Sequence, residues 1–141
     1  MASQEKNKIK EFKFNKKRLT DSFKYASSGI VQAYIGEQNL KIHTIIALIV
    51  VLAGFVLKIS YIEWLICLVL IGLVLMAEFF NTAIEYVVDL ISPEIHPLAK
   101  AAKDTASAGV LMMAIISAIV GIIIFLPKIT NIIGGLLWKK N

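Results

Sequence analysis

The sequence predicts an all-α integral membrane protein with three transmembrane helices and one amphipathic surface helix on their N-terminal side. Of the 141 residues, 57% are hydrophobic and 18% are charged, whereas soluble domains have about 45–50% apolar and about 25% charged residues. The mean hydropathy is +0.74. This composition excludes disorder for most of the chain. A single cysteine excludes a disulfide-stapled fold, and the length favours one domain.

The N-terminal part of the chain is basic. Residues 1–41 contain nine Lys or Arg residues and four Asp or Glu residues. Such a segment attracts either nucleic acid or an anionic membrane surface, and the apolar sequence that follows favours the membrane. We interpret residues 1–18 as a basic tail. In residues 19–36 apolar side chains recur every three or four positions, which is typical of an amphipathic helix, and Thr20 or Asp21 is its candidate N-cap.

Three apolar runs follow and predict spans at about residues 42–58, 61–90 and 106–126. Roughly 20 apolar residues cross a bilayer, and the third run meets this length without a charged residue. Pro127 is expected to end the third span, which leaves residues 127–141 as a C-terminal tail and residues 19–126 as the membrane domain. The small residues 106–109 are expected to let the third helix pack closely against a partner helix.

The distribution of charge predicts the orientation in a cell membrane. Because the excess of Lys and Arg lies before the first span, the N-terminus is expected to be cytoplasmic. With three spans, the turn near residues 58–60 is then outside the cell, and the loop before the third span is inside.

The second run also contains polar residues that share one face of a helix. At about 100° per residue, these residues fall within a single stripe: Glu78, Asn81, Thr82, Glu85 and Asp89. Carboxylates near hydrocarbon are costly unless they are paired, hydrated or bound to metal. The pattern leaves three interpretations open: an ion-pair network that joins the helices, a cation or proton pathway, or a site for Mg²⁺ and a phosphate-bearing substrate.

The same residues resemble a known signature. The stretch 78–85 (EFFNTAIE), followed by Val88-Asp89 and then by Ala102-Lys103-Asp104, resembles the motif of the prokaryotic diacylglycerol kinase family, which are small trispanning lipid kinases. The resemblance covers roughly residues 18–126. It implies a homotrimer with sites shared between subunits, ATP as the phosphate donor and Mg²⁺ as the cofactor.

The resemblance also implies roles for individual residues. Glu78 would be the general base on the lipid hydroxyl, and Glu37 and Glu85 would hold the metal that bridges the phosphates of ATP. Asn81 and Asp89 would support this site. The residues implied around ATP are Arg18, Tyr25, Glu37, Glu85, Glu94, His96, Lys103 and Asp104. The residues implied near the lipid are Arg18, Glu78 and Ser107.

Two other residues receive structural interpretations. Cys67 lies in the middle of a span and is expected to serve packing. His43 is interpreted as a polar residue at the membrane interface rather than as a ligand. The sequence contains neither a phosphate-binding G-x-x-x-x-G-K-[ST] loop nor the motif set of protein kinases.

The expected function is the ATP- and Mg²⁺-dependent phosphorylation of a membrane lipid alcohol. Undecaprenol is favoured over diacylglycerol, because the Lys-, Ile- and Asn-rich composition is typical of low-GC Gram-positive bacteria, whose family members phosphorylate undecaprenol. The alternative from another class is a non-enzymatic membrane protein, either a small ion or proton carrier or a subunit of a larger complex.

Overall fold

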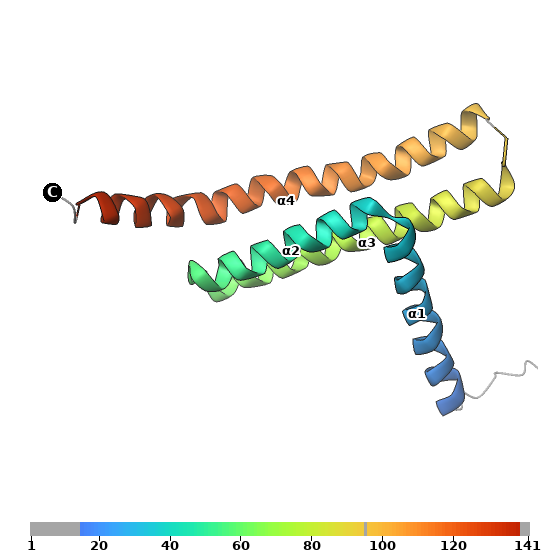
Figure 1. Cartoon of the computed structure of the whole chain (residues 1–141), viewed down its shortest axis with the longest axis horizontal. Coiled ribbons are helices and arrows are strands. Elements are labelled where there is room, and N and C mark those ends of the chain that lie inside the picture. The colour runs from blue at the N-terminus through green and yellow to red at the C-terminus, as the bar shows by residue number, and fades with distance from the viewer. Residues whose placement is uncertain (1–14, 95, 139–141) are drawn as a thin grey trace, which may run out of the picture. The chain divides into compact units, whose positions relative to one another are not determined.

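The computed structural model describes residues 15–94 and 96–138, and all regular structure in this part of the chain is helical (Figure 1). The helices are α1 (Lys16–Gly36), α2 (Gln38–Val56), α3 (Tyr61–Ile91) and α4 (Pro97–Trp138). Residues 15–32 form one compact unit and residues 33–138 form a second. The predicted basic tail comprises residues 1–18, and its residues 1–14 lie outside the described part of the chain.

Helix α1 starts earlier than predicted. The side-chain oxygen Oδ1 of Asn15 accepts hydrogen bonds from the backbone N–H groups of Lys17 (3.0 Å) and Arg18 (3.3 Å). Asn15 is therefore the N-cap, and neither Thr20 nor Asp21 has this role. The prediction of a helix here is confirmed. Because residues 15–32 form a unit of their own, the placement of an amphipathic face on the membrane stays a prediction.

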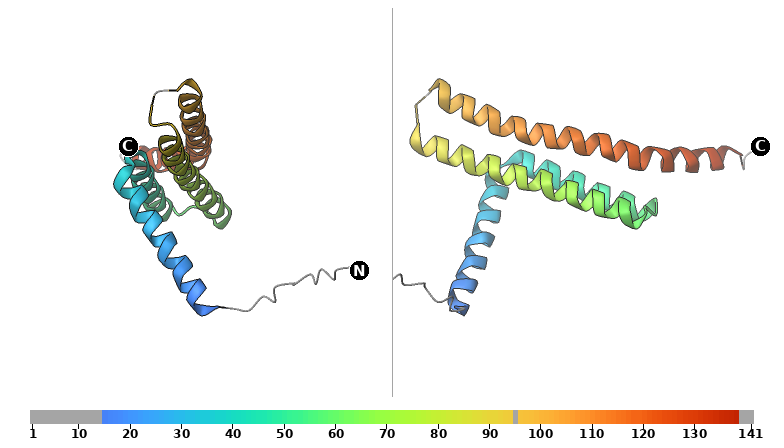
Figure 2. Two further views of the ribbon diagram at one scale, coloured as in Figure 1. Left: turned by 90° about the vertical axis from the view of Figure 1, so that its right-hand side faces the viewer. Right: turned by 180° about the vertical axis from the view of Figure 1, so that it is seen from behind.

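Three helices of residues 33–138 are long and apolar enough to cross a membrane, namely α2, α3 and α4. This confirms the predicted trispanning architecture. Helix α3 is the central element and packs against both α2 and α4 (Figures 1 and 2). Many large apolar side chains of the three helices point away from this packing, including Leu52, Phe55 and Ile122. Such an exposed apolar surface suits contact with lipid chains or with further copies of the protein.

A tight turn connects α2 to α3. Ile59 N–H donates to the carbonyl of Gly54 (3.1 Å), and Lys58 N–H donates to the carbonyl of Phe55 (3.3 Å). Together with the positive φ of 50° at Lys58, these bonds form a Schellman motif. Gly54 is required here for space, because a Cβ atom at this position would lie 2.9 Å from the indole ring of Trp64.

The core of the membrane domain lies next to this turn. Ile59, Cys67 and Ile124 are buried together, and Trp64 and Phe125 pack against them. The prediction that Cys67 serves packing is confirmed. An ion pair between Lys128 Nζ and Glu63 Oε2 (3.1 Å) joins α4 to α3 at the same end of the bundle.

Helix α4 does not end at Pro127 as predicted, but continues through this residue to Trp138. Proline removes one backbone hydrogen bond from a helix, yet Ile124 and Phe125 pack into the core one turn earlier. Lys128 follows directly and is paired with Glu63. These contacts hold α4 against α3 across the proline, and the helix then extends beyond the α2–α3 turn (Figure 1).

Candidate functional site

The first three residues of the polar stripe of α3 are buried in the bundle, whereas Asp89 at the end of the stripe is exposed. Glu78, Asn81 and Thr82 are exposed by only 1%, 5% and 3% of their surface, and they are the buried polar residues of the described chain. Thr82 satisfies its hydroxyl by donating to the carbonyl of Glu78 (3.0 Å). The other two side chains need partners from elsewhere, because a buried polar group without a hydrogen bond is costly.

The closest polar neighbour of the Glu78 carboxylate is a histidine from another helix. His43 on α2 places its Nε2 3.2 Å from Glu78 Oε1. Among the described residues, however, Oε1 has no hydrogen-bond partner with acceptable geometry. The two atoms are therefore in electrostatic contact, and the hydrogen bond is not formed. Such loosely aligned contacts are common in unliganded sites and tighten when the substrate binds.

His43 was missed by sequence reasoning, which interpreted it as an interfacial residue. One signal could have identified it. A carboxylate buried in a membrane helix requires a nearby donor or cation, and the first apolar run contains His43 near its start. The sequence alone did not show that α2 and α3 bring residues 43 and 78 to the same depth.

Asn81 connects the buried carboxylate to a second one. Its Nδ2 donates to Glu85 Oε1 (2.8 Å), one helical turn further along α3. Its own Oδ1 is buried and has no hydrogen-bond partner in the described part of the chain. The site thus presents two unpartnered oxygen atoms, Glu78 Oε1 and Asn81 Oδ1, and one carboxylate held in position by an amide.

Lys103 lies at the loop end of the bundle, where α4 begins. Its Nζ forms two hydrogen bonds to the carboxylate of Asp89, at 2.8 and 3.0 Å. The pair joins the end of α3 to the start of α4 and remains accessible, since the side chain of Asp89 is 63% exposed. Asp104, the predicted companion of Lys103, is exposed.

Glu37 completes the acidic part of the site. It is the N-cap residue of α2, and its half-buried side chain forms no capping bond within the described chain. The charges of Glu37 and Glu85 act on both Glu78 and Lys103, so the four side chains belong to one electrostatic cluster. No three Asp, Glu, His or Cys side chains of the described residues are placed to hold a metal ion on their own.

The remaining predicted residues lie around this cluster or outside it. Glu94 and His96 are exposed in the loop between α3 and α4, and His96 Nδ1 accepts a hydrogen bond from Leu98 N–H (3.2 Å) at the start of α4. Ser107 is exposed on α4, one turn after Lys103. Arg18 and Tyr25 belong to the unit formed by residues 15–32.

The predicted close packing of residues 106–109 is not found within one chain. Nothing in the described structure lies within 4 Å of a Cβ atom built on Gly109, and Ser107 and Ala108 are exposed. The contact that joins α3 to the start of α4 is instead the ion pair between Lys103 and Asp89 (2.8 Å).

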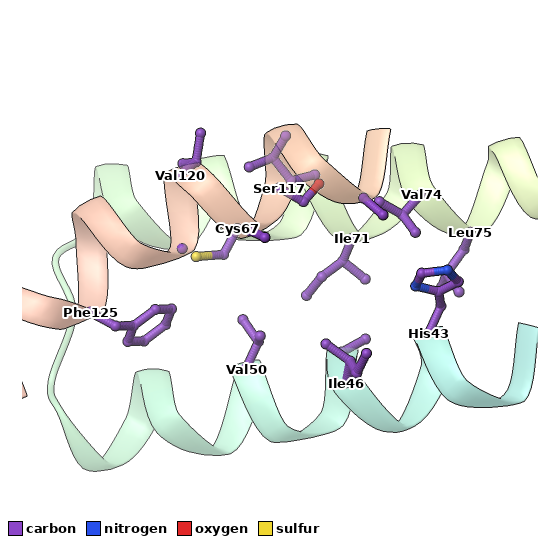
Figure 3. A pocket seen from close by; sticks show the side chains of 15 residues that line it. His43, Ile46, Val50, Cys67, Ile71, Val74, Leu75, Ser117, Val120 and Phe125 are labelled. Carbon is purple, nitrogen blue, oxygen red and sulfur yellow. The ribbon is translucent and has the colours of Figure 1, made fainter. Parts of the chain in front are cut away.

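A cavity of about 360 Å³ lies between α2, α3 and α4 (Figure 3). Its walls are almost entirely apolar, with Ile46 from α2, Ile71 from α3 and Phe125 from α4. His43 lines the cavity at the end nearer the polar stripe, and Cys67 and Phe125 lie toward the opposite end (Figure 3). An apolar space therefore leads along the bundle to the residue that contacts Glu78.

Comparison with known proteins identifies the architecture. Residues 24–125 match the family model described as prokaryotic diacylglycerol kinase. The chain belongs to the prokaryotic diacylglycerol kinase family. It is a lipid kinase and a multi-pass membrane protein. Of the residues that the resemblance assigned to the site, Arg18 lies before the matched region, whereas Tyr25 and all later ones lie within it.

Individual relatives of this lipid kinase carry two different names. The chain is 46% identical over 112 residues to the undecaprenol kinase of Bacillus subtilis, which covers 79% of this chain and 91% of the relative. It is 37% identical over 115 residues to a diacylglycerol kinase of Synechocystis, covering 81% and 66%. It is 38% identical over 97 residues to a diacylglycerol kinase of Helicobacter pylori, covering 68% and 75%.

Proposed function

We propose that this lipid kinase transfers the γ-phosphoryl group of ATP, with Mg²⁺, to the hydroxyl of undecaprenol. In this reaction a bond forms between the lipid oxygen and the γ-phosphorus, and the bond from that phosphorus to its bridging oxygen breaks. ADP leaves, and the proton of the hydroxyl passes to the enzyme. The observation that carries the proposal is the carboxylate of Glu78, which is buried inside a membrane helix and keeps one oxygen without a hydrogen-bond partner.

Glu78 is the group that accepts the proton. A base must lie where the lipid hydroxyl can reach it, and Glu78 is 11 residues from Asp89 along α3, or about 16 Å at about 1.5 Å per residue. The hydrocarbon core is about 30 Å thick. With Asp89 at the interface, Glu78 lies within reach of a lipid alcohol that enters between the helices.

Mg²⁺ would be held by Glu85 and Glu37 together with phosphate oxygens. Mg²⁺ is typically bound by one or two protein carboxylates and the phosphates of its substrate, so a site without three protein ligands fits this ion. Glu85 is already oriented by Asn81, and the Glu37 charge acts on the same cluster. When bound, the ion neutralises charge on the transferred phosphoryl group.

Lys103 would release Asp89 and bind the phosphates of ATP in its place. The pair is exposed and connects two helix ends, so an anionic nucleotide can compete for the ammonium group. Asp104, Glu94, His96, Arg18 and Tyr25 are proposed to line the nucleotide, and Arg18 and Ser107 to contact the lipid headgroup.

The choice of undecaprenol over diacylglycerol is supported by the relative from Bacillus subtilis, which at 46% identity is more similar in sequence than the two diacylglycerol kinases compared above, at 37% and 38%. The apolar cavity beside His43 is compatible with either lipid. Membership in a kinase family leaves the non-enzymatic alternatives, an ion or proton carrier or a passive subunit, without support.

The deciding experiment uses the full chain purified in lipid micelles with γ-labelled ATP and Mg²⁺. Undecaprenol and diacylglycerol are supplied in parallel reactions, with Glu78→Gln as the inactive control. We expect label on undecaprenol at a rate at least tenfold above diacylglycerol. A preference for diacylglycerol would overturn the substrate, and labelling of neither lipid by well-folded protein would overturn the activity.

We further propose that the protein lies in the cell membrane with a cytoplasmic N-terminus, because ATP must reach Lys103. In a Cys67→Ala background, a cysteine at the exposed position Lys100 should resist an impermeant thiol reagent in intact cells and react after lysis. A cysteine at Lys58, in the turn at the other end of the bundle, should react in intact cells. The reverse pattern would contradict this orientation.

A homotrimer is proposed as the assembled form, as the family resemblance implies. The exposed small residues 107–109 of α4 and the open space at Gly109 would give a second copy a surface that one chain leaves uncovered. Native mass spectrometry of the detergent-solubilised protein should give three chains, and Gly109→Leu should reduce that species.

A further inference from the structure

We propose that His43 is a positioning residue for Glu78: its Nε2–H holds Oε1 of the carboxylate, so that the other carboxylate oxygen faces the lipid hydroxyl. The inference rests on the proposed function, in which Glu78 is the base. It adds a residue that none of the sequence motifs includes, on a helix other than the one that carries the base.

The burial of Glu78 is the first reason. Its side chain is only 1% exposed, and its Oε1 has no formed hydrogen bond within the described chain. Leaving such a group without a donor is destabilising, and more so when the group is charged. His43 Nε2, at 3.2 Å, is the group placed to remove this cost.

The charged residues around Glu78 are the second reason, because they do not donate a hydrogen bond to its carboxylate. Glu37 on the α2 side and Glu85 on α3 are both acidic and act on Glu78 by repulsion. Lys103 on α4 has its ammonium group bound to Asp89. In the described part of the chain, His43 is the residue paired with the Glu78 carboxylate, at 3.2 Å.

The position of His43 on α2 is itself well fixed. Thr44, the next residue, donates to the carbonyl of Leu40 (2.8 Å), and its hydroxyl is 2.7 Å from the hydroxyl of Tyr34. Leu40 is completely buried, and the Tyr34 ring contacts Phe79 of α3 edge-on at 6.4 Å between centroids. This packing sets the depth of His43 opposite Glu78, as a supporting residue requires.

The chemical advantage lies in the orientation of the base. A carboxylate with two free oxygens can rotate and present either of them, whereas one held at Oε1 keeps Oε2 toward the substrate. A base oriented by a third group is a general feature of proton-transfer sites. The proton from the lipid hydroxyl then arrives on Glu78, and His43 keeps its own Nε2–H throughout.

The cavity makes the proposal testable by chemical rescue. His43 forms part of the wall of the 360 Å³ cavity (Figure 3), so removal of its side chain opens the cavity toward Glu78. Free imidazole is small enough to enter this space. The matched control is Ser117→Ala, because Ser117 lines the same cavity but bonds only the carbonyl of Met113 within its own helix.

The kinetic experiment compares His43→Ala, His43→Gln and Ser117→Ala in the full chain. We expect His43→Ala to lower kcat by about 10–100-fold, as for other residues that orient a reacting group, with the KM values for ATP and lipid within about twofold. Added imidazole should restore kcat in a saturable manner. His43→Gln, which keeps an N–H donor, should lose less, and Ser117→Ala should change little. Normal kcat in His43→Ala, or an equal loss in Ser117→Ala, overturns the inference.

A second measurement is independent of turnover. The chain contains two histidines, His43 and His96, so a spectrum of ¹⁵N-histidine-labelled protein shows two imidazoles, and His43→Gln assigns them. Glu78→Gln should shift the His43 nitrogen signals and leave those of His96 unchanged. If the His43 signals do not move, the pair does not exist. If they move while the wild-type chain labels no lipid, the pair stands and the proposed function fails.

Discussion

The two ends of the transmembrane bundle are built on opposite principles. At the turn between α2 and α3, polar side chains are paired with one another: Ser60 and Glu63 form a reciprocal capping box, and Glu63 also binds Lys128 (3.1 Å). Toward the other end, Glu78 Oε1 and Asn81 Oδ1 are buried without hydrogen-bond partners in the described chain. One end is held by contacts among its own residues, and the other keeps buried polar atoms without partners.

Residues that stabilise the bundle and residues proposed for function thus lie at different ends of the same helix, α3. Helix α3 supplies Glu63 and Cys67 to the satisfied end and Glu78, Asn81 and Glu85 to the unsatisfied one. Unpaired buried polar groups are rare in folded proteins and require an explanation. The proposed function explains them: His43 would hold Glu78 Oε1 so that Oε2 faces the substrate hydroxyl, and Asn81 Oδ1 would be left for the ion–phosphate complex. Substitutions at the two ends should therefore have different consequences.

The largest effect is expected at Glu78. Glu78→Gln keeps the shape and removes the proton acceptor, so kcat should fall by at least about 10²–10⁴. The melting temperature should stay the same or rise, because a buried charge is removed. Thermal unfolding in micelles and labelled-ATP assays measure the two quantities on one sample. A folded Gln variant with nearly normal turnover would remove Glu78 from the role of base.

A smaller effect is expected at the carboxylates assigned to the metal. Glu85→Gln and Glu37→Gln should each raise the Mg²⁺ concentration required for half-maximal activity and raise the KM for ATP together. We expect shifts of about 10–100-fold, the range for residues that orient or support a metal site. A Mg²⁺ titration at fixed ATP provides the measurement. If Glu37→Gln leaves both values unchanged, Glu37 is a surface carboxylate and no part of the ion site.

The two interhelical ion pairs offer a matched comparison. Lys103–Asp89 and Lys128–Glu63 both join α3 to α4, at 2.8 and 3.1 Å. Lys103→Met should raise the KM for ATP by about tenfold, because a phosphate-binding charge is lost, and each 1.4 kcal/mol corresponds to tenfold in affinity. Lys128→Met should leave the KM unchanged. Equal behaviour of the two variants would contradict the assignment of Lys103 to phosphate.

The smallest effect on turnover is expected at the satisfied end. Ser60→Ala removes the N-cap of α3 and should lower the stability by about 1 kcal/mol. The kcat should not change, because Ser60 lies 18 residues before Glu78 along the chain. Denaturation in micelles, with an activity assay below the transition, measures both. A kcat loss at full folding would show that the two ends are coupled.

Much of the fold could be predicted, because it depends on local patterns. Hydrophobic length places three spans, and the 3.6-residue period aligns Glu78, Asn81 and Glu85 on one face of a helix. Both predictions are confirmed by the structure. The capping box at Ser60 and Glu63 also follows a local pattern, S-x-x-E before an apolar run, although it was not among the predictions.

The prediction for Pro127 failed because it depended on neighbours in space. Proline disfavours a helix in isolation, but packing of Ile124 and Phe125 and the Lys128–Glu63 pair hold α4 across it. The close packing expected of residues 106–109 is not provided by the same chain, since nothing lies within 4 Å of a Cβ atom built on Gly109, and it stays a prediction for a second copy.

The sequence by itself thus determined the membrane architecture, the face of α3 that carries the carboxylates, and the family to which they belong, because each follows from spacing along one segment. Only the tertiary structure decided that His43 meets Glu78 and that Lys103 meets Asp89. The physical reason is that these contacts join different helices. The depth and rotation of the helices relative to one another are set by side-chain packing between them, such as Tyr34 against Phe79 of α3, and not by a pattern within a single helix.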